Sequence, residues 1–325
     1  MKSMSLATIY KEIKHELNAI EKLLETVVEA DQDILTQASS QLLKAGGKRM
    51  RPIMVLLAAQ YGERDREDVR KIAVALELIH MASLVHDDVI DNSEMRRGQQ
   101  TVKSRWDNRV AMYTGDYIFS RSLKLASEIE IPEVHQILSH TMKEISLGEI
   151  EQIEDQYNWT QNVRTYFLRI KRKTALLMAI SCQLGAIAAG APEKVCRHLY
   201  YFGYYTGMSY QIIDDVLDFT ATEKQLGKPA ASDIKQGNVT LPTLIALRKE
   251  NTAERLMTAL KKGDKKTHDW DAIIQLIKDS GSTSEAEKVS TQYIKKAYDQ
   301  LTYLPQTKTT KHMERIADYI SKRKY

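Results

Sequence analysis

Two short clusters of aspartate, each with the spacing DDxxD, are the residues of this sequence best suited to chemistry. They are Asp87, Asp88 and Asp91 in the first cluster, and Asp214, Asp215 and Asp218 in the second. Each lies at the end of a largely apolar run. In a helix, residues four apart share a face, so the outer two aspartates of a cluster stack and the middle one lies about 100° around. Each cluster therefore offers converging carboxylates.

Clustered carboxylates at the ends of apolar helices repel one another and are costly to desolvate unless cations lie between them. Oxygen ligands suit Mg²⁺, a hard ion that commonly completes its coordination with substrate phosphates. We therefore expect a Mg²⁺-diphosphate site. The alternative is two solvated acidic faces, and a single DDxxD motif would leave both interpretations open. The second copy, again after apolar residues, disfavours the alternative.

Basic residues suited to phosphate oxygens recur in several short segments. These segments are Gly46–Pro52, Arg96–Arg97, Lys171–Lys173 and Gly227–Pro229. A single basic residue is usually just part of a solvated face. Together with the two aspartate clusters, however, the segments indicate two diphosphate sites, one held through Mg²⁺ and the other mainly by lysine and arginine.

The elements that must position these residues are helices. The 325 residues include only 6 prolines and 14 glycines, and apolar residues recur at spacings of three and four nearly throughout. We expect an all-α fold forming one domain over residues 1–325. Helices are expected near 6–30, 33–45, 51–62, 66–92, 103–127, 132–155, 161–190, 193–220, 240–260, 270–280, 284–302 and 308–322.

Charge and cysteine content exclude several classes of protein. A net charge of +4, from 47 basic and 43 acidic residues, is too mild for a nucleic-acid surface. Cys182 and Cys196 lack metal-binding spacing, which indicates free thiols in the cytoplasm. We expect no signal peptide and no spanning helix, because the longest apolar stretch, 175–191, is too short and interrupted. The basic end Lys322–Lys324 is expected to be solvated, with at most peripheral membrane contact for product release.

With these motifs in this order from about Leu43 to Leu244, the chain closely resembles the trans-isoprenyl diphosphate synthases. Within that family it is most similar to the catalytic subunits of two-component hexaprenyl or heptaprenyl diphosphate synthases, including the end segment Tyr319–Tyr325. Asn238 stands where many members carry lysine, as it does in that subgroup. The resemblance implies an isoprenoid synthase fold, with antiparallel helices around a deep central cavity.

The resemblance also implies two substrate sites. The six aspartates would bind an allylic diphosphate through Mg²⁺, helped by Arg96, Lys173 and Lys228. Isopentenyl diphosphate would lie on Lys48, Arg51, His80 and Arg97. Spacing alone would make His80 a core histidine of an apolar helix, but its place in Glu77-Leu78-Ile79-His80 matches the substrate histidine of the family.

The implied reaction is ionisation, condensation and elimination. Mg²⁺ and the cations stabilise the departing pyrophosphate, and the isopentenyl double bond attacks the allylic carbocation that forms. The Thr174 hydroxyl and the Gln211 amide would lie beside that cation, and pyrophosphate would accept the proton lost at the end. The catalytic residues implied are Asp87, Asp88, Asp91, Lys173, Thr174, Gln211 and Asp214.

Small residues below the first aspartate cluster predict a long product. A helix from Val69 to Asp87 would rise about 27 Å, enough to line a tunnel for several isoprene units. Ser83 and Ala82 lie beneath Asp87, with Ile79 a further turn down. Family members that stop at farnesyl carry aromatic side chains at the positions of Ala82 and Ser83. We therefore expect a product longer than about fifteen to twenty carbons, although small residues also serve close helix packing. The resemblance to the two-component enzymes implies that this product is hexaprenyl or heptaprenyl diphosphate.

The resemblance implies farnesyl and isopentenyl diphosphates as substrates, a small non-catalytic partner subunit, and a product used as the side chain of a respiratory quinone such as menaquinone. One alternative is a homodimeric medium-chain, long-chain or geranylgeranyl diphosphate synthase. A class I terpene cyclase is disfavoured because such enzymes usually replace the second aspartate cluster and need no isopentenyl site. A non-catalytic partner subunit is disfavoured because it has no use for buried like-charged carboxylates.

Overall fold

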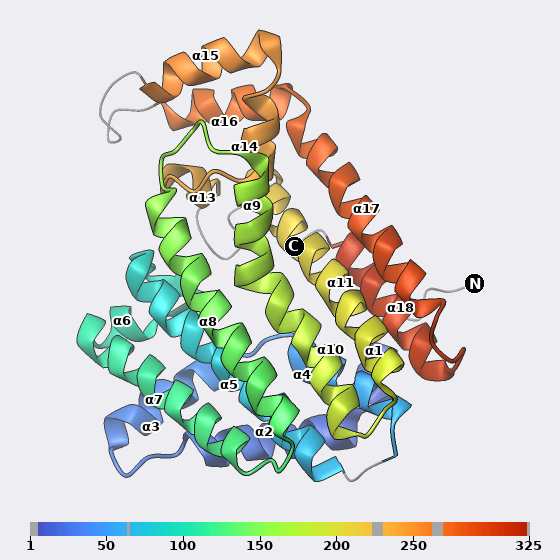
Figure 1. Ribbon diagram of the computed structural model, residues 1–325. Helices are drawn as coiled ribbons and strands as arrows, with labels where there is room; N and C mark the ends of the chain where they lie inside the picture. The colour runs from blue at the N-terminus through green and yellow to red at the C-terminus, as the bar shows by residue number, and fades with distance from the viewer. Residues whose placement is uncertain (1–5, 64–65, 223–229, 262–268, 324–325) are drawn as a thin grey trace. The chain divides into compact units, whose positions relative to one another are not determined.

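The protein is helical, as its low proline and glycine content predicts. The computed structural model describes residues 6–63, 66–222, 230–261 and 269–323 (Figure 1). Within these ranges the only sheet is a pair of two-residue antiparallel strands. No helix in the described part of the chain is both long and apolar enough to cross a membrane. The all-α class is therefore confirmed.

The elements fall into two successive runs along the chain. The first run comprises α1 (Leu6–Glu12), α2 (Lys14–Val28), α3 (Asp33–Lys44), α4 (Met50–Ala58), the 3₁₀ turn η1 (Ala59–Tyr61), α5 (Arg66–Ile90), β1 (Met95–Arg96), β2 (Gln99–Gln100), α6 (Val102–Arg105), α7 (Asn108–Ser127) and α8 (Pro132–Glu154). The second comprises α9 (Val163–Ile170), the π-helix η2 (Lys171–Ala175), α10 (Leu176–Ala188), α11 (Glu193–Thr220), α13 (Ser232–Lys235), α14 (Leu241–Ala246), α15 (Glu250–Lys261), α16 (Trp270–Asp279), α17 (Ser282–Leu301) and α18 (Lys308–Ser321).

Two compact units are built from interleaved segments of the chain. Unit 1 comprises Met1–Thr141, Leu177–Gly203 and Tyr298–Ile316. Unit 2 comprises Met142–Leu176, Tyr204–Ala297 and Ala317–Tyr325. The first aspartate cluster belongs to unit 1 and the second to unit 2. The expectation of a single domain remains a prediction.

Helix α5 organises unit 1. It packs against α2, α4 and α7, and its apolar residues Ile72, Leu76 and Ile79 are buried. Gly115 of α7 permits a close crossing, because a Cβ atom there would lie 2.3 Å from Nε2 of His86. The expected continuous helix from Val69 to Asp87 is therefore observed, and it carries the first aspartate cluster at its carboxyl end.

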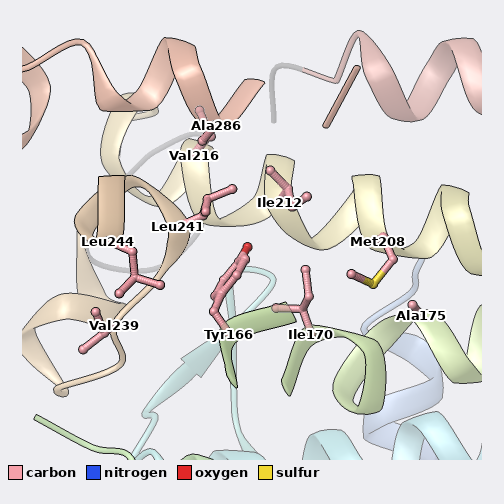
Figure 2. Packing of buried hydrophobic residues seen from close by; sticks show 10 residues of the cluster. All are labelled: Tyr166, Ile170, Ala175, Met208, Ile212, Val216, Val239, Leu241, Leu244 and Ala286. Atoms are coloured by element: carbon pink, nitrogen blue, oxygen red, sulfur yellow. The ribbon is translucent and has the colours of Figure 1, made fainter. Parts of the chain in front are cut away.

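Helices α9 and α11 share the main core of unit 2. Figure 2 shows buried side chains of α9, α11 and the α14 region packed together, with the Tyr166 ring among them. The cluster consists of Tyr166, Ile170, Ala175, Met208, Ile212, Val216, Val239, Leu241, Leu244 and Ala286. A second cluster, which includes Phe219, Ile234, Leu256 and Ile273, joins α11 to α13, α15 and α16. The apolar residues of α11 thus fix the helix that carries the second aspartate cluster.

Several expected helices are interrupted in the structure. The helix expected over 161–190 is divided by η2, a single π-helical turn of a kind that is frequent at functional sites. The helix expected over 103–127 is divided because Thr101 caps α6 and Asp107 caps α7, each by accepting a hydrogen bond from a backbone N–H. The helices expected over 6–30 and 240–260 are also split, into α1 and α2 and into α14 and α15. Periodicity located these helices but not their interruptions.

The sequence also left the β1–β2 hairpin unrecognised. Met95 pairs with Gln100 and Arg96 with Gln99, so the connection is only Arg97 and Gly98. Both connecting residues have positive φ, 52° and 76°, as a tight type I′ hairpin turn requires. This turn places two arginines just beyond the first aspartate cluster.

Candidate active site

The first aspartate cluster lies at the end of α5, and its three members have different surroundings. Asp88 is buried; its Oδ1 accepts a hydrogen bond from Nε of Arg96 at 2.8 Å and lies 2.7 Å from Nη2 of the same guanidinium. Burial raises the pKa of Asp88, while Arg96 opposes that rise. Asp87 and Asp91 are only half-buried. Arg96 therefore neutralises the inner carboxylate, while the outer two keep surface from which they can reach a ligand.

Arg97 turns toward the glycine-rich loop before α4. A Cβ atom on Gly47 would lie 2.7 Å from Nη1 of Arg97, so the guanidinium lies directly against this loop. Lys48 follows Gly47 directly, and its side chain is exposed. The hairpin and the loop thus bring Arg97 next to the Lys48 segment, as a shared anion site requires.

Arg49 fastens this loop to the core of unit 1. Its φ is 45°, and its Nε contacts Oε1 of Glu21 on α2 at 2.6 Å. Its Nη1 contacts Oε1 of Glu77 on α5 at 3.2 Å, and both of these side chains are more than nine-tenths buried. Arg49 is therefore held inward as an anchor, between Lys48 and Arg51. The sequence motif contained Arg49 but did not distinguish its role.

His80 lies within reach of several guanidinium groups. It sits on α5, and its pKa is lowered well below the usual value by burial first, then by the charges of Arg51, Arg97, Arg96 and Arg49. A neutral imidazole among arginines can donate or accept a hydrogen bond without adding charge. The residues predicted to bind isopentenyl diphosphate are thus gathered in one positively charged region of unit 1.

Asp215 of the second cluster is buried and accepts hydrogen bonds at both oxygens. Tyr166 donates its hydroxyl to Oδ2 at 2.7 Å, and Gln211 donates Nε2 to Oδ1 at 2.9 Å. Burial and the neighbouring Asp233 raise the pKa of Asp215 to about 7, and the two hydrogen bonds oppose the rise. Its partners in unit 2 are thus mainly neutral donors, in contrast to the arginine on Asp88.

Asp218 holds the chain that enters α13. Its two carboxylate oxygens accept from Oγ of Ser232 and from the backbone N of Asp233, both at 3.1 Å. Its own carbonyl accepts from the backbone N of Ala231 at 2.8 Å. Asp218 is fully buried, so it shapes the backbone behind the cluster.

Asp214 is half-buried and pairs with Arg323 near the carboxyl terminus. Nη1 of Arg323 donates to Oδ1 of Asp214 at 2.5 Å, and its guanidinium carbon lies 4.4 Å from the centre of the Tyr210 ring. The expectation that this basic end is simply solvated is wrong for Arg323, because the carboxylate and the aromatic ring compensate for its burial. One arginine in a basic tail gave no sequence signal for this contact.

The π-helical turn η2 presents Lys173 and Thr174. Oγ1 of Thr174 donates to Oε1 of Gln211 at 2.6 Å, and Nζ of Lys173 contacts Oε1 of Gln152 at 3.1 Å. Arg172, which was not among the predicted site residues, donates to Glu144 at 3.0 Å and also to Glu151 on α8. Thr174 and Gln211 are therefore adjacent, as the family resemblance implies.

The structure gives less information about the remaining predicted residues. Lys228 lies outside the described residues. Ala82 and Ile79 are buried, whereas Ser83 is half-buried and donates to the carbonyl of His80 at 2.8 Å. Their role in setting product length remains a prediction. Among the described residues, no three His, Cys, Asp or Glu side chains are arranged to hold a metal ion by themselves.

Comparison with known proteins decides the family. The model of the family described as polyprenyl synthetase matches residues 32–277. The chain belongs to this family. Its members are prenyltransferases that need a divalent metal. The enzyme class expected from the aspartate and arginine motifs is therefore confirmed.

Two curated relatives match almost the whole chain. Heptaprenyl diphosphate synthase component 2 of Bacillus subtilis is 51% identical, covering 99% of this chain and 92% of the relative. The protein of the same name from Geobacillus stearothermophilus is 50% identical, covering 99% and 100%. The resemblance to the two-component subgroup is confirmed.

Solved structures agree with the family assignment. Heptaprenyl diphosphate synthase from Staphylococcus aureus has a TM-score of 0.92 and 39% identity, covering 96% of this chain and 99% of that one. A polyprenyl synthase from Caulobacter crescentus, crystallised with calcium and isoprenyl diphosphate, has a TM-score of 0.91 and 29% identity over the full length of both chains. The fold is that of these isoprenoid synthases.

Proposed function

We propose that this protein is the catalytic subunit of a two-component heptaprenyl diphosphate synthase, which extends farnesyl diphosphate with successive isopentenyl diphosphates. The observation that carries the proposal is that Arg97 lies against the Gly47 loop, which bears Lys48 and leads to Arg51, in the region of His80. A diphosphate that must stay intact is best held by fixed cations without a metal that would promote its departure. Isopentenyl diphosphate is such a substrate, and Lys48, Arg51, His80 and Arg97 are its proposed ligands.

The allylic diphosphate is proposed to bind through Mg²⁺. Its proposed ligands are Asp87, Asp88 and Asp91 with Asp214, Asp215 and Asp218, assisted by Arg96, Lys173 and Lys228. The donor set fits, because Mg²⁺ usually takes one or two carboxylates and completes its shell with water and substrate phosphates. The half-buried Asp87, Asp91 and Asp214 supply such carboxylates. Bound there, Mg²⁺ neutralises charge on the departing diphosphate.

The protein's own groups then favour charge separation. Lys173 and Arg96 add positive charge beside the leaving diphosphate, and the Thr174 oxygen with the Gln211 amide lies beside the positive charge that develops on the allyl group. The hydrogen bond of 2.6 Å between Thr174 and Gln211 supports a shared role for these two groups. The chemistry needs no nucleophilic side chain.

Seven isoprene units are proposed rather than six, because two relatives at 50 and 51% identity carry the heptaprenyl name. Ala82, Ser83 and Ile79 are proposed to leave room for this chain. The relatives are also called component 2, which supports a heterodimer with a small non-catalytic subunit. Cys182 and Cys196 are buried free thiols, which supports the cytoplasmic location.

The test is to incubate the purified chain, alone and with a candidate small subunit, with farnesyl diphosphate, labelled isopentenyl diphosphate and Mg²⁺. The dephosphorylated products are then chromatographed. We expect all-trans heptaprenol only when both subunits are present. Full activity of the chain alone would indicate a homodimeric synthase instead, and cyclic hydrocarbons or no isopentenyl incorporation under either condition would refute the proposed function.

A further inference from the structure

Three consecutive hydrogen bonds connect the core of unit 2 to Thr174. Tyr166 donates to Asp215 at 2.7 Å, Gln211 donates to the other oxygen of Asp215 at 2.9 Å, and Thr174 donates to Gln211 at 2.6 Å. Figure 2 shows the Tyr166 oxygen pointing from α9 toward α11, among apolar neighbours. We call these four residues the Tyr166 relay.

The relay has a fixed direction. The Tyr166 hydroxyl donates to Oδ2 of Asp215, because a carboxylate oxygen can only accept. The Gln211 N–H₂ group faces Asp215, and its carbonyl therefore faces Thr174. A threonine hydroxyl has one hydrogen and two acceptor lone pairs. Because that hydrogen is used on Gln211, Thr174 can offer only lone pairs to anything else.

We propose that Tyr166 is a positioning residue for prenyl transfer, acting through Asp215 and Gln211 to hold the Thr174 oxygen as an acceptor beside the allylic cation. The inference rests on the proposed function. Tyr166 has no exposed surface, so it does not touch substrate itself. Three hydrogen bonds link its hydroxyl to the Thr174 oxygen. Through them the hydroxyl fixes the orientation of Asp215, Gln211 and Thr174.

The first test is a double-mutant cycle with Tyr166→Phe and Thr174→Val, measured on the first condensation of farnesyl with isopentenyl diphosphate. Tyr166→Phe should lower kcat about tenfold, as expected for loss of a buried donor to a carboxylate, and leave KM for isopentenyl diphosphate unchanged. In the Thr174→Val background the same change should lower kcat less than about twofold, because the Thr174 hydroxyl on which the relay acts is already absent. If Tyr166 had only a structural role, the reductions in kcat of the two single variants would multiply in the double variant.

Two further variants keep the result interpretable. Tyr293→Phe removes a hydroxyl from a neighbouring aromatic ring outside the relay, and kcat should stay at the wild-type value; the Tyr293 ring centre lies 6.0 Å from that of Phe167. Gln211→Met removes the central member of the relay, and it should lower kcat more than Tyr166→Phe does, because Gln211 is also proposed to lie beside the cation.

The outcomes separate the two proposals. Wild-type enzyme that incorporates no isopentenyl diphosphate, alone or with its partner subunit, refutes the proposed function and the relay with it. If the wild-type enzyme is active but Tyr166→Phe has no effect on kcat, the positioning role of Tyr166 is refuted and the proposed function stands. The same holds if the effects of Tyr166→Phe and Thr174→Val multiply in the double variant.

Discussion

The two aspartate clusters share one spacing, but their buried middle aspartates have different partners. In unit 1 the buried Asp88 is neutralised by Arg96, an arginine only a few residues further along the chain. In unit 2 the buried Asp215 is held by Tyr166 and Gln211, which carry no charge. The comparison teaches that DDxxD specifies where carboxylates lie on a helix, whereas residues outside the motif, near or distant in the sequence, decide how each one is stabilised.

This difference has a physical consequence for each cluster. The Asp88–Arg96 pair depends on charge, and the burial of Asp88 limits how far salt can screen it. The hydrogen bonds on Asp215 are short, buried and directional, so they hold geometry with little dependence on ionic strength. We therefore interpret Asp88 as stabilised mainly by charge and Asp215 as stabilised mainly by hydrogen bonds from neutral groups.

The strongest test of the comparison removes the outer aspartates. Asp87→Ala and Asp214→Ala should each lower turnover at least about a hundredfold, because each removes an oxygen ligand from the proposed metal site. The fold should persist, since both side chains are only half-buried. Initial rates in saturating Mg²⁺ and circular dichroism melting would measure the two effects. Near-wild-type rates would contradict the metal assignment.

A second test asks whether the residues one helical turn below the first aspartate cluster set the length of the product. Ser83→Phe, or Ala82→Tyr, places an aromatic ring one turn below Asp87 and should shorten the product to about farnesyl or geranylgeranyl length. Reverse-phase chromatography of the dephosphorylated products measures this directly. An unchanged product distribution would refute the tunnel argument.

Arg49 tests the dependence of unit 1 on ion pairs. Arg49→Gln leaves Glu77 buried without its guanidinium partner, and breaking such a pair costs about 3 kcal/mol of unfolding free energy. KM for isopentenyl diphosphate should also rise, because the loop carrying Lys48 loses its anchor. Urea denaturation and initial rates measure these effects. Arg109→Gln, an exposed arginine of α7, is the matched control, and equal destabilisation by both variants would count against the anchor.

The smallest expected effect is on pH dependence. The pKa of His80 is lowered in the folded state, so folding favours its neutral form. That contribution is fully present above the unfolded value of about 6.5 and is lost as pH falls below it toward the folded value. Thermal melting between pH 7.5 and 5.5 should therefore change less in His80→Asn than in the wild type. Identical pH dependence in the two proteins would contradict this role.

Much of the fold and many of the candidate site residues could be predicted from local patterns. Helices such as α5 and α11 follow from apolar residues at spacings of three and four, and these helices place both clusters. The basic loop before α4 was recognised because lysine and arginine follow two glycines. Thr174 and Gln211 were assigned by family resemblance, and they are in contact as that implies.

The partners of these residues could not be predicted, because they come from distant parts of the chain. Tyr166 is one aromatic residue in an apolar helix, and nothing in its neighbours shows that it reaches Asp215. Glu77 resembles any other helical glutamate until Arg49 folds against it. The π-helical turn at Lys171–Ala175 leaves the local residue pattern unchanged, so helix periodicity does not reveal it.

The contact between Arg323 and Asp214 has a practical consequence for handling the protein. A purification tag or fluorescent label fused behind residue 325 would follow, within a few residues of sequence, a side chain that pairs with a candidate magnesium ligand. Such a fusion could change apparent magnesium requirements without any substitution in the aspartate motifs. Kinetic work on this enzyme is therefore best done with the carboxyl end left native.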